Sequence, residues 1–298
     1  MAPDDPSDPR IRMIPARPWC LSLPYVTEPC PDELLSSWLR RTAAEYGVSF
    51  EQLAQHVGLS RTKPADIDHD LSPDEVGQLA GAMRVERAEV RRRLHPPLRP
   101  PARSLRARRA PIQVCATCRT RHLASYAHPV VLRAWFEFWR VECQACQSLL
   151  SSLRKLVLDR CNPAREYPNW FSGIMPAARR GADRLHAFAR RPFSVMPSPV
   201  AVLCLLSKPL PTGWPDDDGL FRYGPHRVAD LFVSGLGELT REAGVLVPDA
   251  WTAKKPVRLV TARVILLAGL SHFLADPAAS FDRVQGAADR RAGSFPKH

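Results

Sequence analysis

The chain has 298 residues, a formal net charge of +12 at pH 7, and apolar side chains at 45% of its positions. This composition is ordinary for a folded globular protein and excludes disorder throughout. It also contains no run of about 18 uncharged apolar residues, the length that a membrane span needs.

The most apolar stretch, residues 257–275, carries Arg258 and Arg263 and predicts a buried helix rather than a span. Residues 1–17 are acidic, interrupted by prolines and without the apolar core of a secretory signal, so we expect a disordered leader. A cytoplasmic location without a membrane follows, and in that compartment thiols stay reduced.

The stretch "CPDELLSSWLRRTAAEYG" predicts a helix that begins at Pro31 and ends at Gly47, with Glu33 near the positive end of the helix dipole. One face carries the residues expected to be buried, namely Leu35, Trp38, Leu39, Thr42 and Tyr46.

A second short helix is predicted directly after it, where Ser49 and Gln52 form a capping box and Gly58 ends the helix. Two helices joined by a glycine turn resemble a helix-turn-helix unit, although a plain helical hairpin has the same pattern. Gln52, Gln55 and His56 are the side chains that could reach a DNA groove.

A further helix is predicted after Ser72, with Pro73 at its first position and Glu75 closing a capping box. A turn near Met83 leads to another short helix. Residues 18–95 therefore predict one N-terminal all-helical domain, helix-turn-helix-like in its first half.

The composition then changes. Between Arg84 and Ala110 there are ten arginines and two glutamates, a net charge of 10 − 2 = +8, and four prolines. We expect such a stretch not to pack as a core, but to be solvated or bound to phosphate. Residues 96–111 are thus predicted to be an Arg/Pro-rich linker. Two roles remain possible, a solvated linker without contacts and a segment that contacts nucleic acid. The candidate nucleic-acid-binding residues are Arg91, Arg92, Arg93, Arg99, Arg103, Arg106, Arg108 and Arg109.

Two Cys-x-x-Cys pairs lie in residues 112–160, formed by Cys115 with Cys118 and by Cys143 with Cys146. In a reducing compartment this spacing predicts a tetrahedral four-sulfur site for one structural zinc ion. His122 and His128 lie between the pairs, and loop positions facing solvent suit them better than ligand roles. Free buried cysteines are the alternative.

A catalytic zinc is disfavoured, because it needs an open ligand position and a nearby base. No histidine is followed two residues later by glutamate, and no His-Glu-x-x-His motif occurs. Trp135 and Trp139 lie between the cysteine pairs, where they could stack on bases, but we expect them to pack around the metal.

Residues 161–298 predict a C-terminal α-helical domain, with helical patterns in "PAARRGADRLHAFARR", "SPVAVLCLLSKPL", "PHRVADLFVSGLGELTREAG" and "KPVRLVTARVILLAGLSHFLADP". Asp216, Asp217 and Asp218 form an acidic loop that lacks the spacing of a calcium site. Phosphate-binding, dinucleotide-binding and nucleophile-elbow motifs are absent from the sequence, so no enzyme is predicted.

The order of these parts over residues 18–155 resembles the TniQ family, transposon-encoded proteins that help select or prepare a target for insertion. The N-terminal residues that carry the resemblance are Glu33, Leu34, Ser36, Ser37, Trp38, Leu39, Ala43, Tyr46 and Gly47. Those in the cysteine segment are Cys115, Cys118, Arg133, Trp135, Cys143, Leu149 and Leu150. Family members commonly have histidine at the position of Cys146. The cysteine marks this chain as a divergent member, but it serves equally well as a zinc ligand.

The sequence therefore predicts a mainly α protein with a helical N-terminal domain, a zinc-ribbon-like centre and a helical C-terminal domain. The resemblance implies a non-enzymatic adaptor of a bacterial mobile element. It would dock on target DNA or an RNA–protein complex and work with a separate transposase and an ATPase regulator. A homodimer is compatible with the sequence. The alternative is a stand-alone helix-turn-helix transcriptional regulator.

Overall fold

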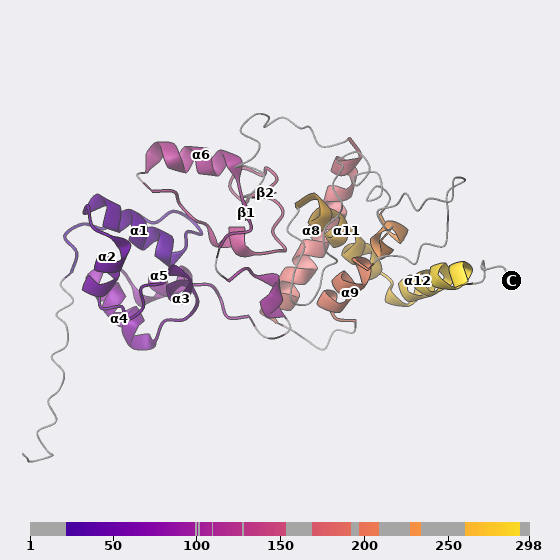
Figure 1. The fold of residues 1–298 in the computed structure, drawn as a ribbon, viewed down its shortest axis with the longest axis horizontal. Helices are drawn as coiled ribbons and strands as arrows, with labels where there is room; N and C mark the ends of the chain where they lie inside the picture. Colours follow the sequence, from indigo (N-terminus) through magenta and orange to yellow (C-terminus); the bar gives the residue numbers. More distant parts are fainter. Residues whose placement is uncertain are drawn as a thin grey trace, which may run out of the picture. The chain divides into compact units, whose positions relative to one another are not determined.

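The computed structural model describes residues 22–98, 100, 102–108, 110–126, 128–152, 169–191, 197–208, 227–233 and 260–292. Within these ranges the chain is mainly helical and contains one two-stranded antiparallel sheet, so the predicted fold class is confirmed. The chain divides into two compact units, residues 1–95 and 96–298, whose helices and strands are labelled in Figure 1. Each unit has its own hydrophobic core.

The first unit is built from short helices around a core that contains Trp38. They are α1 (Leu35–Glu45), α2 (Phe50–His56), α3 (Pro64–His69), α4 (Pro73–Ala82) and α5 (Arg87–Arg92). The buried stripe of α1 includes Leu35, Leu39 and Thr42 as predicted, whereas Tyr46 is exposed. The predicted capping boxes at α2 and α4 are confirmed, each with its serine and its glutamine or glutamate in reciprocal hydrogen bonds.

The predicted start of α1 at Pro31 is wrong by four residues, because the residues before Leu35 place the Glu33 carboxylate in the core of the unit. Glu33 lies outside the helix in the core of the unit and accepts two hydrogen bonds from Arg41, at 2.9 and 2.7 Å. Ser37 donates a third hydrogen bond to the same carboxylate. A buried carboxylate needs such hydrogen-bond donors. Because the Glu33 side chain turns inward to accept from Arg41 and Ser37, residues 31–33 form a turn instead of the first turn of the helix.

The second unit combines the cysteine segment with the C-terminal helices. Its elements are η1 (Ala102–Leu105), β1 (Gln113–Val114), α6 (Ala116–Ser125), η2 (Arg133–Phe136), β2 (Ser151–Ser152), α8 (Asn169–Arg190), α9 (Pro199–Leu206), η3 (Val228–Leu231), α11 (Val260–Phe273) and α12 (Pro277–Ala292). Three of the four predicted C-terminal helical patterns correspond to α8, α9 and α11. The pattern at residues 225–244 begins with η3, and its last part lies outside the described residues, as does the acidic loop.

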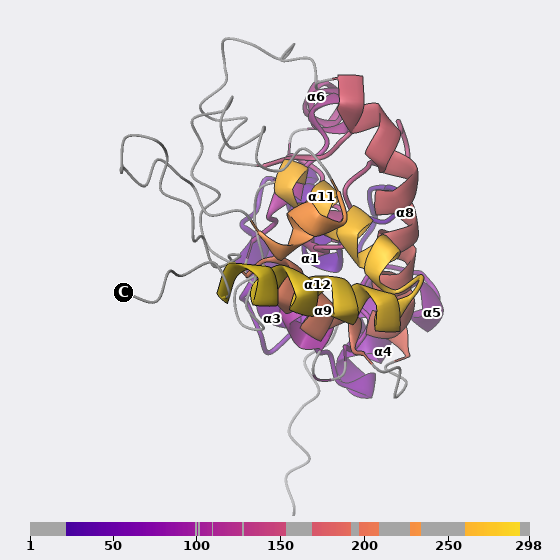
Figure 2. The same ribbon diagram turned by 90° about the vertical axis from the view of Figure 1, so that its right-hand side faces the viewer.

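Helices α8 and α11 lie side by side and form the centre of the second core (Figures 1 and 2). The two backbones come close together at Gly181, where an added Cβ would lie 1.9 Å from the carbonyl oxygen of Leu267. Only glycine fits between two backbones this close. None of the described helices is long and apolar enough on its own to cross a bilayer.

The arginine-rich stretch between Arg84 and Ala110 was expected to stay outside any core. This is wrong for Val90, which is buried in the core of the first unit, and for the segment 102–106. Ala102 and Leu105 are buried in the same core as α8 and α11. The backbone of Leu105 accepts a hydrogen bond from Phe138, and that of Ala107 donates one to Phe136, at 3.0 and 2.9 Å. Two apolar residues that follow the four prolines, Ala102 and Leu105, thus help to attach this stretch to the cysteine segment.

Candidate metal centre

The first cysteine pair lies at the junction of β1 and α6. Cys115 follows the strand directly and is the N-cap of the helix, and Cys118 lies in the first helical turn. The backbone N–H of Cys118 points at the Cys115 sulfur, with the nitrogen 3.4 Å from Sγ. This turn aims both sulfurs to the same side of the helix.

The second pair lies in a tight turn between residues 141 and 150. The backbone N–H groups of Cys143 and Leu150 donate to the carbonyl oxygens of Ser148 and Val141, both at 2.8 Å, and Gln147 closes the turn with a φ of 60°. The antiparallel pairing of β2 with β1 then joins the two halves. Residues that are 25 or more positions apart in the chain are brought together in this way.

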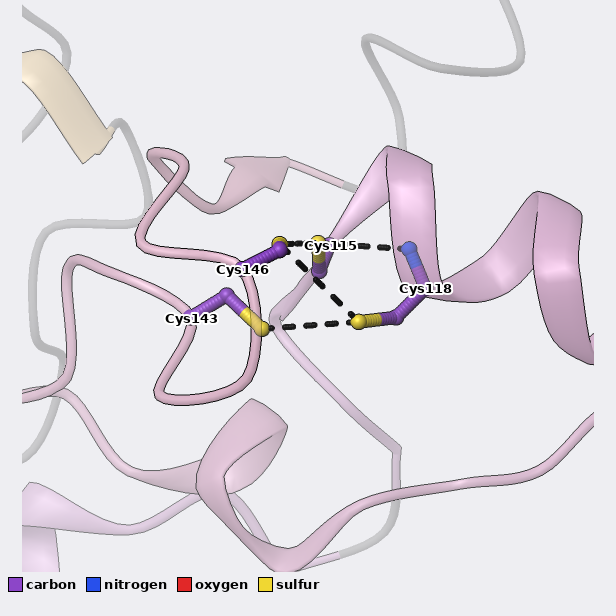
Figure 3. Close-up of side chains that lie close together, drawn as sticks. All are labelled: Cys115, Cys118, Cys143 and Cys146. Atoms are coloured by element: carbon purple, nitrogen blue, oxygen red, sulfur yellow. Dashed lines mark hydrogen bonds between the residues drawn. The ribbon is translucent and has the colours of Figure 1, made fainter.

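The four sulfurs face one another across the gap between α6 and this turn (Figure 3). All four sulfurs lie within 4.8 Å of one another. The Cys115 and Cys146 sulfurs are 3.2 Å apart, those of Cys118 and Cys143 3.5 Å, and those of Cys118 and Cys146 4.0 Å. In a tetrahedral zinc site with bonds of about 2.3 Å the sulfurs are about 3.8 Å apart. The separations bracket this value and are far longer than the ~2.05 Å of a disulfide, so the four sulfurs could hold one metal ion.

Burial and hydrogen bonding act unequally on the four thiols. Burial raises the pKa of Cys118 above its usual range, and it also raises the pKa of Cys143, against hydrogen bonds from the backbone of Cys146 and Ala145. The Ser148 hydroxyl lowers the pKa of Cys146 to about 6. That hydroxyl lies 3.0 Å from the Cys146 sulfur and 3.3 Å from the Cys115 sulfur. A bound divalent cation would favour the thiolate form at all four positions.

Other metal-binding side chains of the described residues stay apart from this cluster. His122 is on α6, where its ring contacts Tyr126, and His128 is exposed, so neither joins the four thiols. Cys30 and Cys204 lie elsewhere, and Cys20 and Cys161 are outside the described residues. No second group of metal-ligating side chains occurs in the described part of the chain.

The aromatic residues between the cysteine pairs are buried, as predicted. Trp135 and Trp139 expose 3% and 2% of their surface, and Phe138 is equally buried. Trp139 and Phe138 belong to the same core as α8 and α11, and the Trp139 ring also contacts His186. Rings in these positions support the fold and cannot stack on nucleic-acid bases.

A buried polar connection joins the metal centre to the C-terminal helices. The Gln113 side chain, two residues before Cys115, donates to the carbonyl oxygens of Ala134, Glu137 and Arg140 and accepts from the guanidinium of Arg263 on α11. Arg263 is fully buried, and burial lowers its pKa to about 9. Among the described residues no carboxylate pairs with it. The sequence carries no local signal for this contact between residues 150 positions apart.

The candidate nucleic-acid-binding arginines fall into three groups. Arg91, Arg92, Arg103 and Arg108 are exposed, and Arg92 pairs with Glu89. Arg99 and Arg109 are outside the described residues.

The third group is buried. Arg93 is 9% exposed and pairs with Glu89, and its guanidinium also binds the backbone oxygen of Cys30. Arg106 is 7% exposed, lies 3.7 Å from the Glu137 carboxylate and donates to the Pro96 carbonyl. These two guanidinium groups hold the fold together in their own units and do not face solvent.

Comparison with known proteins gives one match: a family model described as TniQ matches residues 24–148. Residues 24–148 belong to the TniQ family. The matched range covers the whole first unit from residue 24 onward and contains all four cysteines. TniQ domains are associated with target selection in transposition and act as non-catalytic accessories in systems with other transposition proteins. No curated protein and no solved structure matches the chain.

Proposed function

We propose that this chain is a zinc-stabilised, non-enzymatic adaptor in DNA transposition. In this role it docks on target DNA or on a target-bound nucleoprotein complex and directs a separate transposase and its ATPase regulator to that site. The observation that carries the proposal is the convergence of four thiols inside a TniQ region.

The donor set supports zinc in a structural role. Four sulfurs fill a tetrahedral coordination sphere, which leaves no position for a water or a substrate. Zinc would be held by Cys115, Cys118, Cys143 and Cys146, and in that place it would tie α6 to the turn at residues 141–150. A reducing cytoplasm would keep the thiols available for the metal.

The described residues include exposed arginines that suit docking on nucleic acid, whereas α2 has few side chains that could recognise a DNA sequence. Exposed arginines at 91, 103 and 108 suit phosphate contacts. On α2, the Gln52 side chain is engaged in the capping box, which leaves Gln55 and His56 as exposed groove-reading groups. This small number favours the adaptor over a stand-alone transcriptional regulator, which would need several base contacts per half-site.

The adaptor role is tested in cells that carry the transposon with this chain deleted, by sequencing the insertion sites after complementation. Wild-type protein should restore insertion at the preferred target. The Cys143→Ser variant should not restore it, and Cys204→Ala, which changes a cysteine outside the cage, should behave as the wild type. An insertion frequency and distribution that are the same with and without the chain would contradict the role.

A further inference from the structure

The four cysteines of the metal centre differ in their access to solvent. Cys115, Cys118 and Cys143 expose 0%, 3% and 6% of their surface. Cys146 is only partly buried, and the residues on both sides of it in the turn are exposed. A small reactive solute that diffuses to the cage therefore meets Cys146 before the other three cysteines.

The sulfurs also form two unequal pairs. The Cys146 sulfur is 3.2 Å from that of Cys115, and the Cys118 sulfur is 3.5 Å from that of Cys143 (Figure 3). A disulfide needs a sulfur separation of about 2.05 Å, so the first pair has little further to move. The accessible cysteine thus has a buried cysteine within reach, whereas both members of the second pair are enclosed.

We propose that Cys146 is a peroxide-sensitive modification site, whose oxidation ends in a Cys146–Cys115 disulfide and opens the metal centre. The Cys146 thiolate attacks hydrogen peroxide, an S–O bond forms as the O–O bond breaks, and hydroxide leaves a sulfenic acid behind. The Cys115 thiolate then attacks the Cys146 sulfur, an S–S bond forms as the S–O bond breaks, and a second hydroxide leaves. Each hydroxide takes a proton from solvent. Two thiolates are thereby oxidised to one disulfide, and one peroxide is reduced to two waters.

The disulfide keeps one connection of the cage and removes another. Cys115 directly follows β1 and Cys146 lies in the turn at residues 141–150, so a bond between them still joins the two halves of the segment. Sulfurs in a disulfide are no longer metal ligands, and Cys118 and Cys143 alone are too few for a closed tetrahedral site. The first turn of α6 is then released, because Cys118 is the single buried residue of this helix. A helix of ten residues is marginal by itself in water, so α6 frays.

Oxidation in this way changes the chain without breaking it apart. A dithiol reductant reverses the disulfide by exchange, and the four thiolates are then available to the metal again. The proposal rests on the four-thiol cage that the proposed function also uses, and it adds a reversible response to peroxide.

The test treats the full zinc-loaded chain with hydrogen peroxide and maps disulfides by mass spectrometry after alkylation of the remaining thiols. Free zinc is followed in the same samples with a chromogenic chelator. The Cys115–Cys146 disulfide should form first and be accompanied by loss of zinc from the chain, and dithiothreitol with added zinc should restore the starting state. Trypsin should cleave after Arg121, an exposed residue of α6, faster in the oxidised chain than in the zinc-loaded chain.

A Cys146→His variant separates oxidation from metal binding. Histidine keeps a ligand for zinc but cannot form a disulfide, so this variant should retain its zinc at a peroxide concentration that empties the wild type. The matched control is Cys204→Ala, which removes a partly buried cysteine outside the cage and should lose zinc as the wild type does. If Cys146→His does not bind zinc, the order of disulfide formation in the wild type decides alone.

Three results would overturn the proposal: a first disulfide between Cys118 and Cys143, a Cys115–Cys146 disulfide in a chain that keeps its zinc, or equal rates of zinc loss from the wild type and a zinc-loaded Cys146→His variant. None of them touches the adaptor role, which is measured by insertion sites in cells. Failure of the adaptor role would in turn leave the disulfide map of the purified chain unchanged.

Discussion

Replacing Gln113 by alanine should weaken the metal centre and the C-terminal helices together. The Gln113 side chain reaches three backbone carbonyls around η2 and the Arg263 guanidinium on α11, and all of these groups are buried or partly buried. Without it, Arg263 keeps the carbonyl oxygen of Phe138 as its acceptor among the described residues, at 3.3 Å. A fully buried cation would then be without its side-chain partner.

The size of the effect follows from the burial of Arg263. A hydrogen bond to a charged group contributes about 1.5–3 kcal/mol, and the buried carbonyls are deprived of their donor in addition. Burial already disfavours the charged guanidinium and lowers the pKa of Arg263 to about 9, so this cation depends on the few acceptors that it has. We therefore expect Gln113→Ala to lower the free energy of unfolding by about 3–5 kcal/mol.

The assay is denaturant unfolding followed by circular dichroism, with released zinc measured by a chromogenic chelator in the same samples. In the Gln113→Ala variant, the midpoints of unfolding and of zinc release should shift together to lower denaturant concentration. Arg263→Met removes the buried cation, so the double variant Gln113→Ala/Arg263→Met should be more stable than Gln113→Ala alone. Additive costs within about 0.5 kcal/mol in this double-mutant cycle would refute the connection between the two parts.

Three other predictions concern buried residues of the two units. Trp135→Ala should cost about 3–5 kcal/mol and lower the melting temperature and zinc retention together, since the ring is buried; a well-folded variant that is defective only in nucleic-acid binding would contradict this. Burial raises the pKa of Asp68 from 3.8 to about 6, so the folded state holds this proton more tightly and stability should fall as pH rises from about 4 to 6, by about 3 kcal/mol in all. Asp68→Asn should remove this decline, and an unchanged pH profile would exclude Asp68 as its source. Gly181→Ala should cost about 1–3 kcal/mol or more in thermal unfolding, whereas Gly173→Ala in the same helix meets open space and should not destabilise.

The features that the sequence predicted well depend on neighbouring residues. The capping boxes of α2 and α4 need only a serine and a side chain three positions later, and the cage needs two Cys-x-x-Cys pairs. The burial of Trp135 and Trp139 follows from their size and apolar character. These features depend on residue types and short spacings, which are visible in the sequence itself.

The features that the sequence did not reveal are contacts between distant segments. Arg106 looks like the other arginines of its stretch, and its burial depends on Glu137, a residue of the cysteine segment. The shifted start of α1 depends on the buried Glu33–Arg41 pair, and the Gln113–Arg263 contact spans 150 positions. The exposure of α6, in which Cys118 is the single buried residue, could not be predicted either. It depends on which other segments of the unit pack against the helix.

Metal analysis of the purified chain, combined with thermal unfolding, tests the central claim most directly. Protein prepared without chelators should contain about one zinc per chain. Cys143→Ser should lose the metal and the cooperative unfolding of residues 96–298, while Cys204→Ala keeps both. Zinc-free wild-type protein that melts at the same temperature as the metal-loaded form would contradict the claim that this cage holds the fold.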